Sequence, residues 1–319
     1  MHISKHAWNA AIWMGCVVMA NGKDGLVCNK ANGRVEASDG DTLVFAWQAS
    51  PLENPVGGDK FKGSAFLHPL RTPGGFEWTS SQPKDHFHHF GVWWPWKFIE
   101  VDGKKYNCWE IQEGQGGLVA KDVRILSGGP KTLSWQFKNE TVIKNPGTDP
   151  VTAIHEAATL SLEVIDDAQV IDVLLDQKSA VGPVKIVEYR YSGFSWRGPA
   201  SWNKDNSKMT TSEGKSREDA NGTVARWVVV SGKSPTGDAS VLLMSAAEET
   251  AGIPEKIRVW DAKMENGTPF INFNPVMEKP LMLDDKNPAV SKRKYRIIAA
   301  DRVINAADAE TEWKKWLGK

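Results

Sequence analysis

The sequence has no excess of charge of either sign and no long apolar run beyond its first residues. Lysine plus arginine and aspartate plus glutamate are equal at 39 each, so no overall field favours nucleic acid or an anionic membrane surface. After the N-terminal region, no segment approaches about 18 uninterrupted apolar residues, the length that crosses a bilayer. We therefore expect no nucleic-acid partner and no transmembrane segment.

Cysteine is also scarce, with three in 319 residues. None lies in a C-x-x-C spacing, so the usual redox and zinc-ribbon patterns are absent. Cys28 and Cys108 could pair in an oxidising compartment, or both could be unpaired and partly buried thiols. The sequence leaves both alternatives open because it does not give the distance between the two residues.

Residues 1–20 are typical of an export signal. Lys5 gives a weakly basic start, an apolar stretch follows, and Val18-Met19-Ala20 fits a small-residue cleavage site. This predicts a signal peptide over 1–20 and a mature chain from Asn21. In the alternative interpretation, Cys16 is a lipid-anchored cysteine. In either case we expect an exported protein that is periplasmic, secreted or surface-anchored.

Short runs of β-branched and aromatic residues recur along the chain, separated by Asn-Gly, Asp-Gly and Gly-Gly turns. Apolar and polar residues alternate over 160–164, which predicts a strand with one buried face. The one good helix pattern is 306–317, which Asn305 can cap and Gly318 can end. Without a repeat or a low-complexity linker, this pattern predicts a single large antiparallel β-sandwich domain over 21–319 with a short C-terminal helix.

The candidate site lies in a segment rich in histidine, Asp85-His86-Phe87-His88-His89. If the segment is extended, His86 and His88 project to one face, as ligands of one metal ion would, and His89 to the other. His68 could add a third ligand or an acid/base group. Asp85 could orient an imidazole. These residues predict a catalytic centre that could hold a divalent cation such as Zn²⁺ or Ca²⁺.

Two alternatives to a metal site remain. In a metal-free site, a histidine would act as general base and a carboxylate as acid, because histidine titrates near neutral pH. In a structural loop, the histidines would only bond backbone groups.

Tryptophan is abundant, with 15 residues. Trp93 and Trp96 follow the histidines and could stack on a sugar ring or belong to the core. Arg197, beside Trp196, could clamp a carboxylate or hydroxyl groups, or lie on the surface. Asn274 could contact a substrate or only shape a turn. We treat all five as candidate site residues.

Two ordered motifs resemble the PmoA-like proteins, a family of unknown function found largely in polysaccharide-degrading bacteria. They are Phe66-Leu67-His68-Pro69-Leu70-Arg71-Thr72-Pro73-Gly74 and Pro83-Lys84-Asp85-His86-Phe87-His88-His89-Phe90-Gly91. Residues 191–197 and 294–298 are similar to later elements of that family, although Ser192 replaces a glycine. The resemblance covers roughly residues 40–301. The family's methane-oxygenase label implies a membrane enzyme, which a chain without a membrane span cannot be.

This resemblance implies an exported β-sandwich, with the galactose-mutarotase-like supersandwich as one form, and a role in carbohydrate catabolism. The residues it carries over are His68, Arg71, Asp85, His86, His88, His89 and Arg197. The resemblance does not assign their individual roles; we expect Arg71 and His89 to contact the substrate.

We therefore expect a carbohydrate-active enzyme that cleaves or rearranges a glycoside by hydrolysis or β-elimination. The absence of a paired-carboxylate motif favours chemistry centred on histidine. The alternatives are a non-catalytic carbohydrate-binding protein, in which tryptophans bind and histidines brace a loop, and a structural sandwich with no open pocket near His88.

Overall fold

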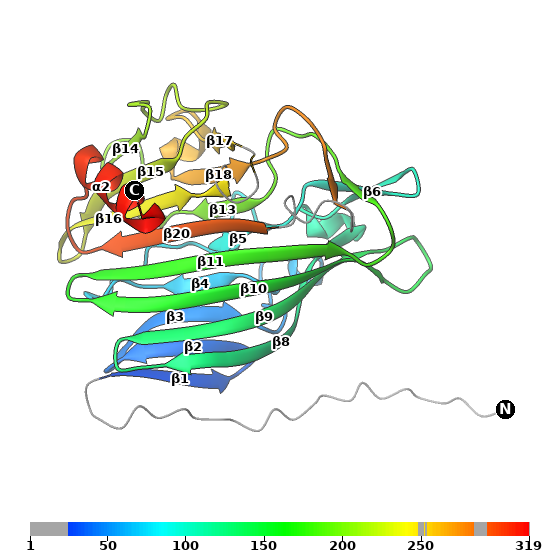
Figure 1. Ribbon diagram of the computed structural model, residues 1–319, viewed down its shortest axis with the longest axis horizontal. Coiled ribbons are helices and arrows are strands. Elements are labelled where there is room, and N and C mark those ends of the chain that lie inside the picture. Colours follow the sequence, from blue (N-terminus) through cyan, green and yellow to red (C-terminus); the bar gives the residue numbers. More distant parts are fainter. Residues whose placement is uncertain (1–24, 248–251, 253, 284–291, 319) are drawn as a thin grey trace.

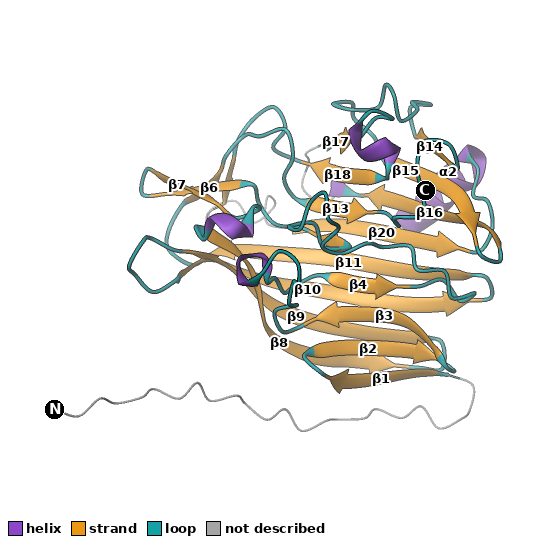
Figure 2. Ribbon diagram, turned by 180° about the vertical axis from the view of Figure 1, so that it is seen from behind, coloured by secondary structure: helices purple, strands orange, loops and turns teal. Residues whose placement is uncertain are grey.

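The computed structural model describes residues 25–247, 252, 254–283 and 292–318. This part of the chain forms three antiparallel sheets, and the two larger ones lie face to face (Figures 1 and 2). None of its helices is long and apolar enough to cross a bilayer. The expected signal peptide over 1–20, with Cys16, lies outside the described residues.

The first sheet has the strand order β1-β2-β3-β4-β5-β13-β18-β17. In chain order its strands are β1 (Leu26–Ala31), β2 (Arg34–Asp39), β3 (Thr42–Gln48), β4 (Leu67–Leu70), β5 (Val92–Trp93), β13 (Phe194–Arg197), β17 (Lys256–Val259) and β18 (Phe270–Asn274). The strands β4, β5, β13, β17 and β18 come from distant parts of the sequence, and the loops between them build the candidate site.

The second sheet has the order β14-β15-β16-β20-β11-β10-β9-β8. Its strands are β8 (Gly116–Gly128), β9 (Thr132–Ile143), β10 (Val151–Ile165), β11 (Ala168–Ser179), β14 (Ser207–Thr211), β15 (Trp227–Ser234), β16 (Gly237–Ser245) and β20 (Lys292–Ala300). The third sheet, at one end of the sandwich, contains β6 (Phe98–Val101), β7 (Lys104–Asn107), β12 (Val184–Ile186) and β19 (Leu281–Leu283). Three short 3₁₀ helices, η1 (Asp59–Phe61), η2 (Ile111–Glu113) and η3 (Met264–Gly267), lie in the connections.

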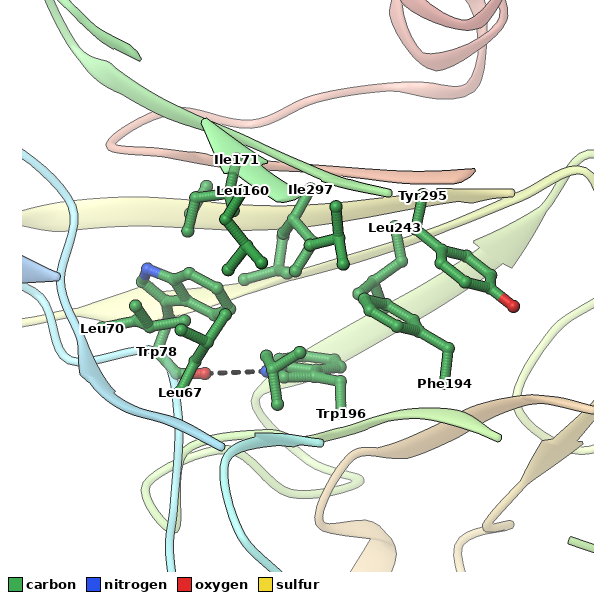
Figure 3. Close-up of a cluster of buried hydrophobic side chains, with 14 of the residues drawn as sticks. Leu67, Leu70, Trp78, Leu160, Ile171, Phe194, Trp196, Leu243, Tyr295 and Ile297 are labelled. Carbon is green, nitrogen blue, oxygen red and sulfur yellow. Dashed lines mark hydrogen bonds between the residues drawn. The ribbon is translucent and has the colours of Figure 1, made fainter. Parts of the chain in front are cut away.

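The main core lies between the two large sheets and follows from the period of two along their strands. On β10, Leu160 and Leu162 are buried, whereas Ser161 between them and Glu163 after them are not, which confirms the predicted alternation. Leu160 and Ile171 meet Leu67 and Trp196 of the first sheet in this core (Figure 3). The prediction of a large antiparallel sandwich is confirmed.

A buried carboxylate also lies in this sandwich. Glu156 of β10 accepts hydrogen bonds from Trp94 Nε1 at 2.9 Å, Asn139 Nδ2 at 2.8 Å and Gln177 Nε2 at 2.7 Å. Burial raises the pKa of Glu156, and the three donors oppose that rise. The side chain is 4% exposed, so its polar atoms depend on these partners rather than on water.

The C-terminal helix α2 (Ala306–Leu317) has the predicted bounds. Asn305 Oδ1 accepts from the backbone of Ala307 and Asp308, and Gly318 ends the helix in the left-handed conformation. Trp313 and Trp316 pack with Trp227 on the second sheet.

The two described cysteines do not pair. Cys28 and Cys108 are both buried and free, which corrects the alternative in which they form a disulfide. Cys28 Sγ accepts from Trp135 Nε1 at 3.4 Å in the main core. Cys108 belongs to a second core formed with the third sheet, and burial raises the pKa of its thiol to about 12.

Candidate functional site

The histidine segment folds into two successive turns. The backbone N–H of His86 donates to Pro83 O at 2.9 Å, and that of His89 donates to His86 O at 3.0 Å. The prediction of an extended segment, with His89 facing away, was therefore wrong, because bonds between residues three apart replace the alternation of a strand. The ring centroids lie 4.7 Å apart for His86 and His89 and 4.9 Å apart for His88 and His89. All three imidazoles form one cluster.

Long-range backbone contacts hold the base of this turn segment in place. Gln82 N donates to His89 O at 2.7 Å, and Gly91 N donates to Ser80 O at 2.8 Å. Gly91 has φ +56°, and a Cβ there would lie 2.2 Å from Leu67 O. Only glycine fits this approach, so the loop is closed tightly onto the first sheet.

A chain of polar contacts orients His86. Arg197, on β13, donates from Nη2 to Asp85 Oδ2 at 2.6 Å, and the same oxygen lies 3.2 Å from His86 Nδ1. Burial raises the pKa of Asp85, but the hydrogen bond with His86 and the charge of Arg197 outweigh it, so the pKa lies below its ordinary value. Asp85 is thus a carboxylate that favours the His86 tautomer with its proton on Nδ1.

Burial keeps two of the three histidines neutral. It lowers the pKa of His88 to about 4, with further lowering from the charges of His86 and Lys97. It also lowers the pKa of His89 well below its ordinary value, since this side chain is almost completely buried. Both rings are therefore uncharged at neutral pH and can donate or accept hydrogen bonds.

This burial predicts that the protein loses stability in acid. Because the pKa of His88 falls from 6.5 in the unfolded chain to about 4 in the folded protein, the unfolded chain binds an extra proton between these values. The contribution of the neutral His88 to the free energy of unfolding is then fully present above about pH 6.5, and it is lost as the pH falls toward 4. Urea midpoints measured across this range should fall less for His88→Gln than for wild type. His155→Gln, at an exposed histidine of β10, should behave as wild type. If the urea midpoints of wild type and both variants fell equally with pH, His88 would not be the source of the acid sensitivity.

The histidines line a pocket in the surface of the sandwich. Its walls are formed by His86, His88, His89, Trp109, Glu110, Arg190, Tyr191, Arg258, Trp260, Met264 and Phe270. His89 stacks on Phe270 with ring centroids 5.0 Å apart, and Trp260 lies 5.1 Å from the same ring. The pocket therefore combines aromatic rings with ionisable groups, and its presence beside His88 removes the main support for a purely structural role.

Glu110 is held in the pocket wall by two donors. Its Oε1 accepts from the Tyr191 hydroxyl at 2.6 Å, and its Oε2 contacts Lys97 Nζ. Lys97 has a side chain 5% exposed, so the pair is shielded from solvent. Burial and the neighbouring Tyr189 raise the pKa of Tyr191, which keeps its hydroxyl protonated and donating to Glu110.

The other histidine motif lies apart from this pocket. His68 Nδ1 is 2.9 Å from Thr79 Oγ1, and burial lowers the pKa of His68 to about 4, assisted by the charges of Arg71 and Arg34. Arg71 donates to Glu77 Oε2 at 2.7 Å. Neither His68 nor Arg71 lines the pocket.

The expected ligand set of His86, His88 and His68 is consequently not formed. Within the described part of the chain, the group of three side chains with suitably close ligand atoms is Asp85, His86 and Glu265, all within 4.8 Å of one another. The expected carboxylate neighbour of the imidazole is present. Asp85 and Glu265 of η3 occupy the places in this group that were expected for His88 and His68.

The predicted aromatic contacts also fall in different places. Trp93 is buried directly behind the pocket, 5.1 Å from the His89 ring. Trp96 belongs to the second core, under Arg293. Trp196 is fully buried in the main core and donates from Nε1 to Trp78 O at 3.0 Å (Figure 3). None of the three tryptophans lines the pocket. All three are buried core residues, not contacts for a sugar ring.

Asn274 shapes a turn and does not contact the pocket, which was the second of the two roles considered for it. Its Nδ2 donates to Tyr189 O at 2.8 Å and its Oδ1 accepts from Val276 N at 3.0 Å. Asn274 is 1% exposed. Its amide nitrogen and oxygen are both bonded to the backbone and are therefore not available to a substrate.

Sequence reasoning did not select Trp260, Arg258 or Arg190 for the site. Alternation along β17 does place Arg258 on the face opposite Ile257 and Val259, which are buried. That pattern was a usable signal for an outward-facing arginine. It could not indicate that η3 and the histidine loop would enclose this face.

Fold and site together define an antiparallel β-sandwich protein with an aromatic pocket lined by histidines. The chain belongs to the Family of unknown function (DUF6807), whose model matches residues 34–314. The expectation of an uncharacterised family is confirmed, whereas the PmoA-like name is not. A search of curated proteins found no match.

Solved structures similar to this chain include a galactose mutarotase-like protein from Lactobacillus casei, with 8% identity, 86% of this chain and 99% of that chain covered, and a TM-score of 0.40. A GalM/aldose epimerase homologue from C. elegans has 10% identity, covers 92% and 100%, and has a TM-score of 0.38. A GH36 α-galactosidase from Geobacillus stearothermophilus has 9% identity, covers 91% and 42%, and also has a TM-score of 0.38.

Proposed function

We propose that this protein is an exported carbohydrate-active enzyme that cleaves or rearranges a glycoside in the pocket described above. The observation that carries the proposal is the contact chain from Arg197 through Asp85 to His86 at the wall of an aromatic pocket. A structural loop has no need of a histidine oriented by an anchored carboxylate. General acid–base catalysis does need one. Export rests on the sequence of residues 1–20.

The walls of the pocket suit a sugar. A pyranose has an apolar face, which packs on rings such as Trp260 and Tyr191, and a hydroxylated edge, which needs polar partners. His88, His89 and Glu110 lie among those rings and supply donors and acceptors. This combination orients a sugar ring relative to His86.

The arrangement favours histidine as the proton acceptor. With Nδ1 bonded to Asp85, the free Nε2 lone pair of His86 is the basic atom. Hydrolysis by the usual route needs two opposed carboxylates, and of the described pocket-lining residues Glu110 is the one carboxylate. Asp85 is already engaged by Arg197 and His86. We therefore place β-elimination or another proton abstraction ahead of two-carboxylate hydrolysis.

A metal-dependent form of the proposal would use Asp85, His86 and Glu265. Two carboxylates and an imidazole suit Zn²⁺ and similar divalent ions. However, Arg197 Nη2 lies 2.6 Å from Asp85 Oδ2, and its positive charge opposes a cation at that oxygen. We therefore propose the metal-free form first.

Incubation of the purified protein with a panel of oligosaccharides tests this function. We expect new reducing ends or unsaturated products from at least one substrate, and we expect EDTA to leave turnover intact. Loss of turnover with EDTA, restored by Zn²⁺, would replace the metal-free form by the metal-dependent one. Binding without any product would support a non-catalytic carbohydrate-binding protein, and neither binding nor product would contradict both functions.

A further inference from the structure

Two arginines face the same pocket. Arg258 projects from β17, and Arg190 lies in the connection between β12 and β13. They are close enough that the charge of Arg190 adds to burial in lowering the pKa of Arg258. Arg258 is half-buried, donates to Asn221 Oδ1 at 2.9 Å and reaches Met264 Sδ at 3.4 Å. These neutral contacts hold the guanidinium in position without balancing its charge.

Two of the carboxylates around the pocket are already occupied. Glu110 is bonded to Lys97 and Tyr191. Asp85 is paired with Arg197. Of the described residues that line the pocket, Arg190 and Arg258 are the cations without a carboxylate partner among the lining side chains.

The remaining carboxylate near Arg258 is also engaged. Asp261 Oδ1 accepts from the backbone N–H of Lys263 at 2.9 Å and of Met264 at 3.1 Å. Between the described residues, neither Arg190 nor Arg258 has a carboxylate oxygen within the 4.0 Å of an ion pair. Arg258 is half-buried and Arg190 is exposed beside it. The two positive charges repel each other and Arg258 also loses hydration, so an anionic ligand would stabilise both.

We propose that this pocket binds an acidic sugar, a uronic acid whose carboxylate lies between Arg190 and Arg258. The inference rests on the proposed function and adds its substrate class. The fork of N–H donors on a guanidinium matches a carboxylate, and the sugar ring would lie against the aromatic walls. A neutral sugar could fill the same volume, but it would leave the two charges unbalanced.

Calorimetric titration with galacturonate and glucuronate, compared with galactose and glucose, tests this inference. We expect the uronates to bind about 10- to 100-fold more tightly, the range of a charged hydrogen bond, and to lose affinity as salt rises. Arg258→Gln and Arg190→Gln should each remove most of this preference, because they lower the affinity for uronates much more than that for neutral sugars. Arg302→Gln, at an arginine that pairs with Asp167 outside the pocket, is the matched control and should keep it.

Other outcomes separate the two proposals. Equal binding of uronates and neutral sugars would overturn the acidic-sugar inference and leave the proposed function in place. Tighter binding of a sugar sulfate or phosphate than of either uronate would overturn the carboxylate assignment. If no sugar, charged or neutral, bound to the wild-type protein or was turned over by it, the proposed function itself would fail. Unfolding midpoints of the glutamine variants confirm that a loss of binding is not a loss of fold.

Discussion

His86→Ala should slow turnover of a glycoside substrate by about 100- to 10,000-fold, the usual contribution of a positioned acid or base. The substitution removes the imidazole that Asp85 orients and leaves the aromatic walls in place, so the loss should fall mainly on kcat. The side chain is 28% exposed, and we expect the unfolding midpoint to change little. Steady-state kinetics together with urea denaturation would measure both quantities.

Two further variants sharpen the test of His86. Asp85→Asn keeps the shape but removes the charge that favours the Nδ1-protonated tautomer, so it should also lower kcat, with a shift in the pH profile. His155→Ala, at an exposed histidine of β10, should have wild-type kinetics. Wild-type turnover by His86→Ala would remove the central residue of the proposed function.

Trp196→Ala should lower the free energy of unfolding by about 3–5 kcal/mol, the range for a large aromatic residue lost from a core. Trp196 has no exposed surface, and the change would also leave Trp78 O without its donor. Trp196→Phe, which keeps most of the buried ring, should cost clearly less. Urea unfolding followed by circular dichroism would measure both.

The same variant separates a core residue from a ligand contact. At temperatures where Trp196→Ala is still folded, its affinity for a bound sugar should equal that of wild type. A destabilisation below about 1 kcal/mol combined with lost binding would instead return Trp196 to the pocket, against its place in the core.

Much of the fold was predictable because its signals are local. Alternation over 160–164 reflects the period of a strand, and the capping of 306–317 depends on Asn305 and Asp308, which are only three residues apart at the start of the helix. The location of the site in the histidine segment was an inference of the same kind, since several ionisable residues occur together.

The geometry of the site was less predictable because it depends on distant contacts. Turns replace an extended strand at the histidines, where Gly91 packs against Leu67 O and Gln82 bonds to His89 O. Tryptophan composition could not separate Trp196 in the core from Trp260 in the pocket. Each is an aromatic residue near an arginine in the sequence, and only the packing of the sheets assigns their environments.

The buried Glu156 has a consequence for how the second sheet is aligned during folding. Its partners Asn139 and Gln177 stand directly across from it on β9 and β11. Sliding either neighbouring strand by two residues would keep the apolar residues inward, so hydrophobic contact alone does not forbid it. Such a shift would take away one of the three donors to the desolvated Glu156 side chain, at a cost of about 1–3 kcal/mol. Glu156 therefore favours the observed alignment of β9, β10 and β11 over alignments shifted by two residues.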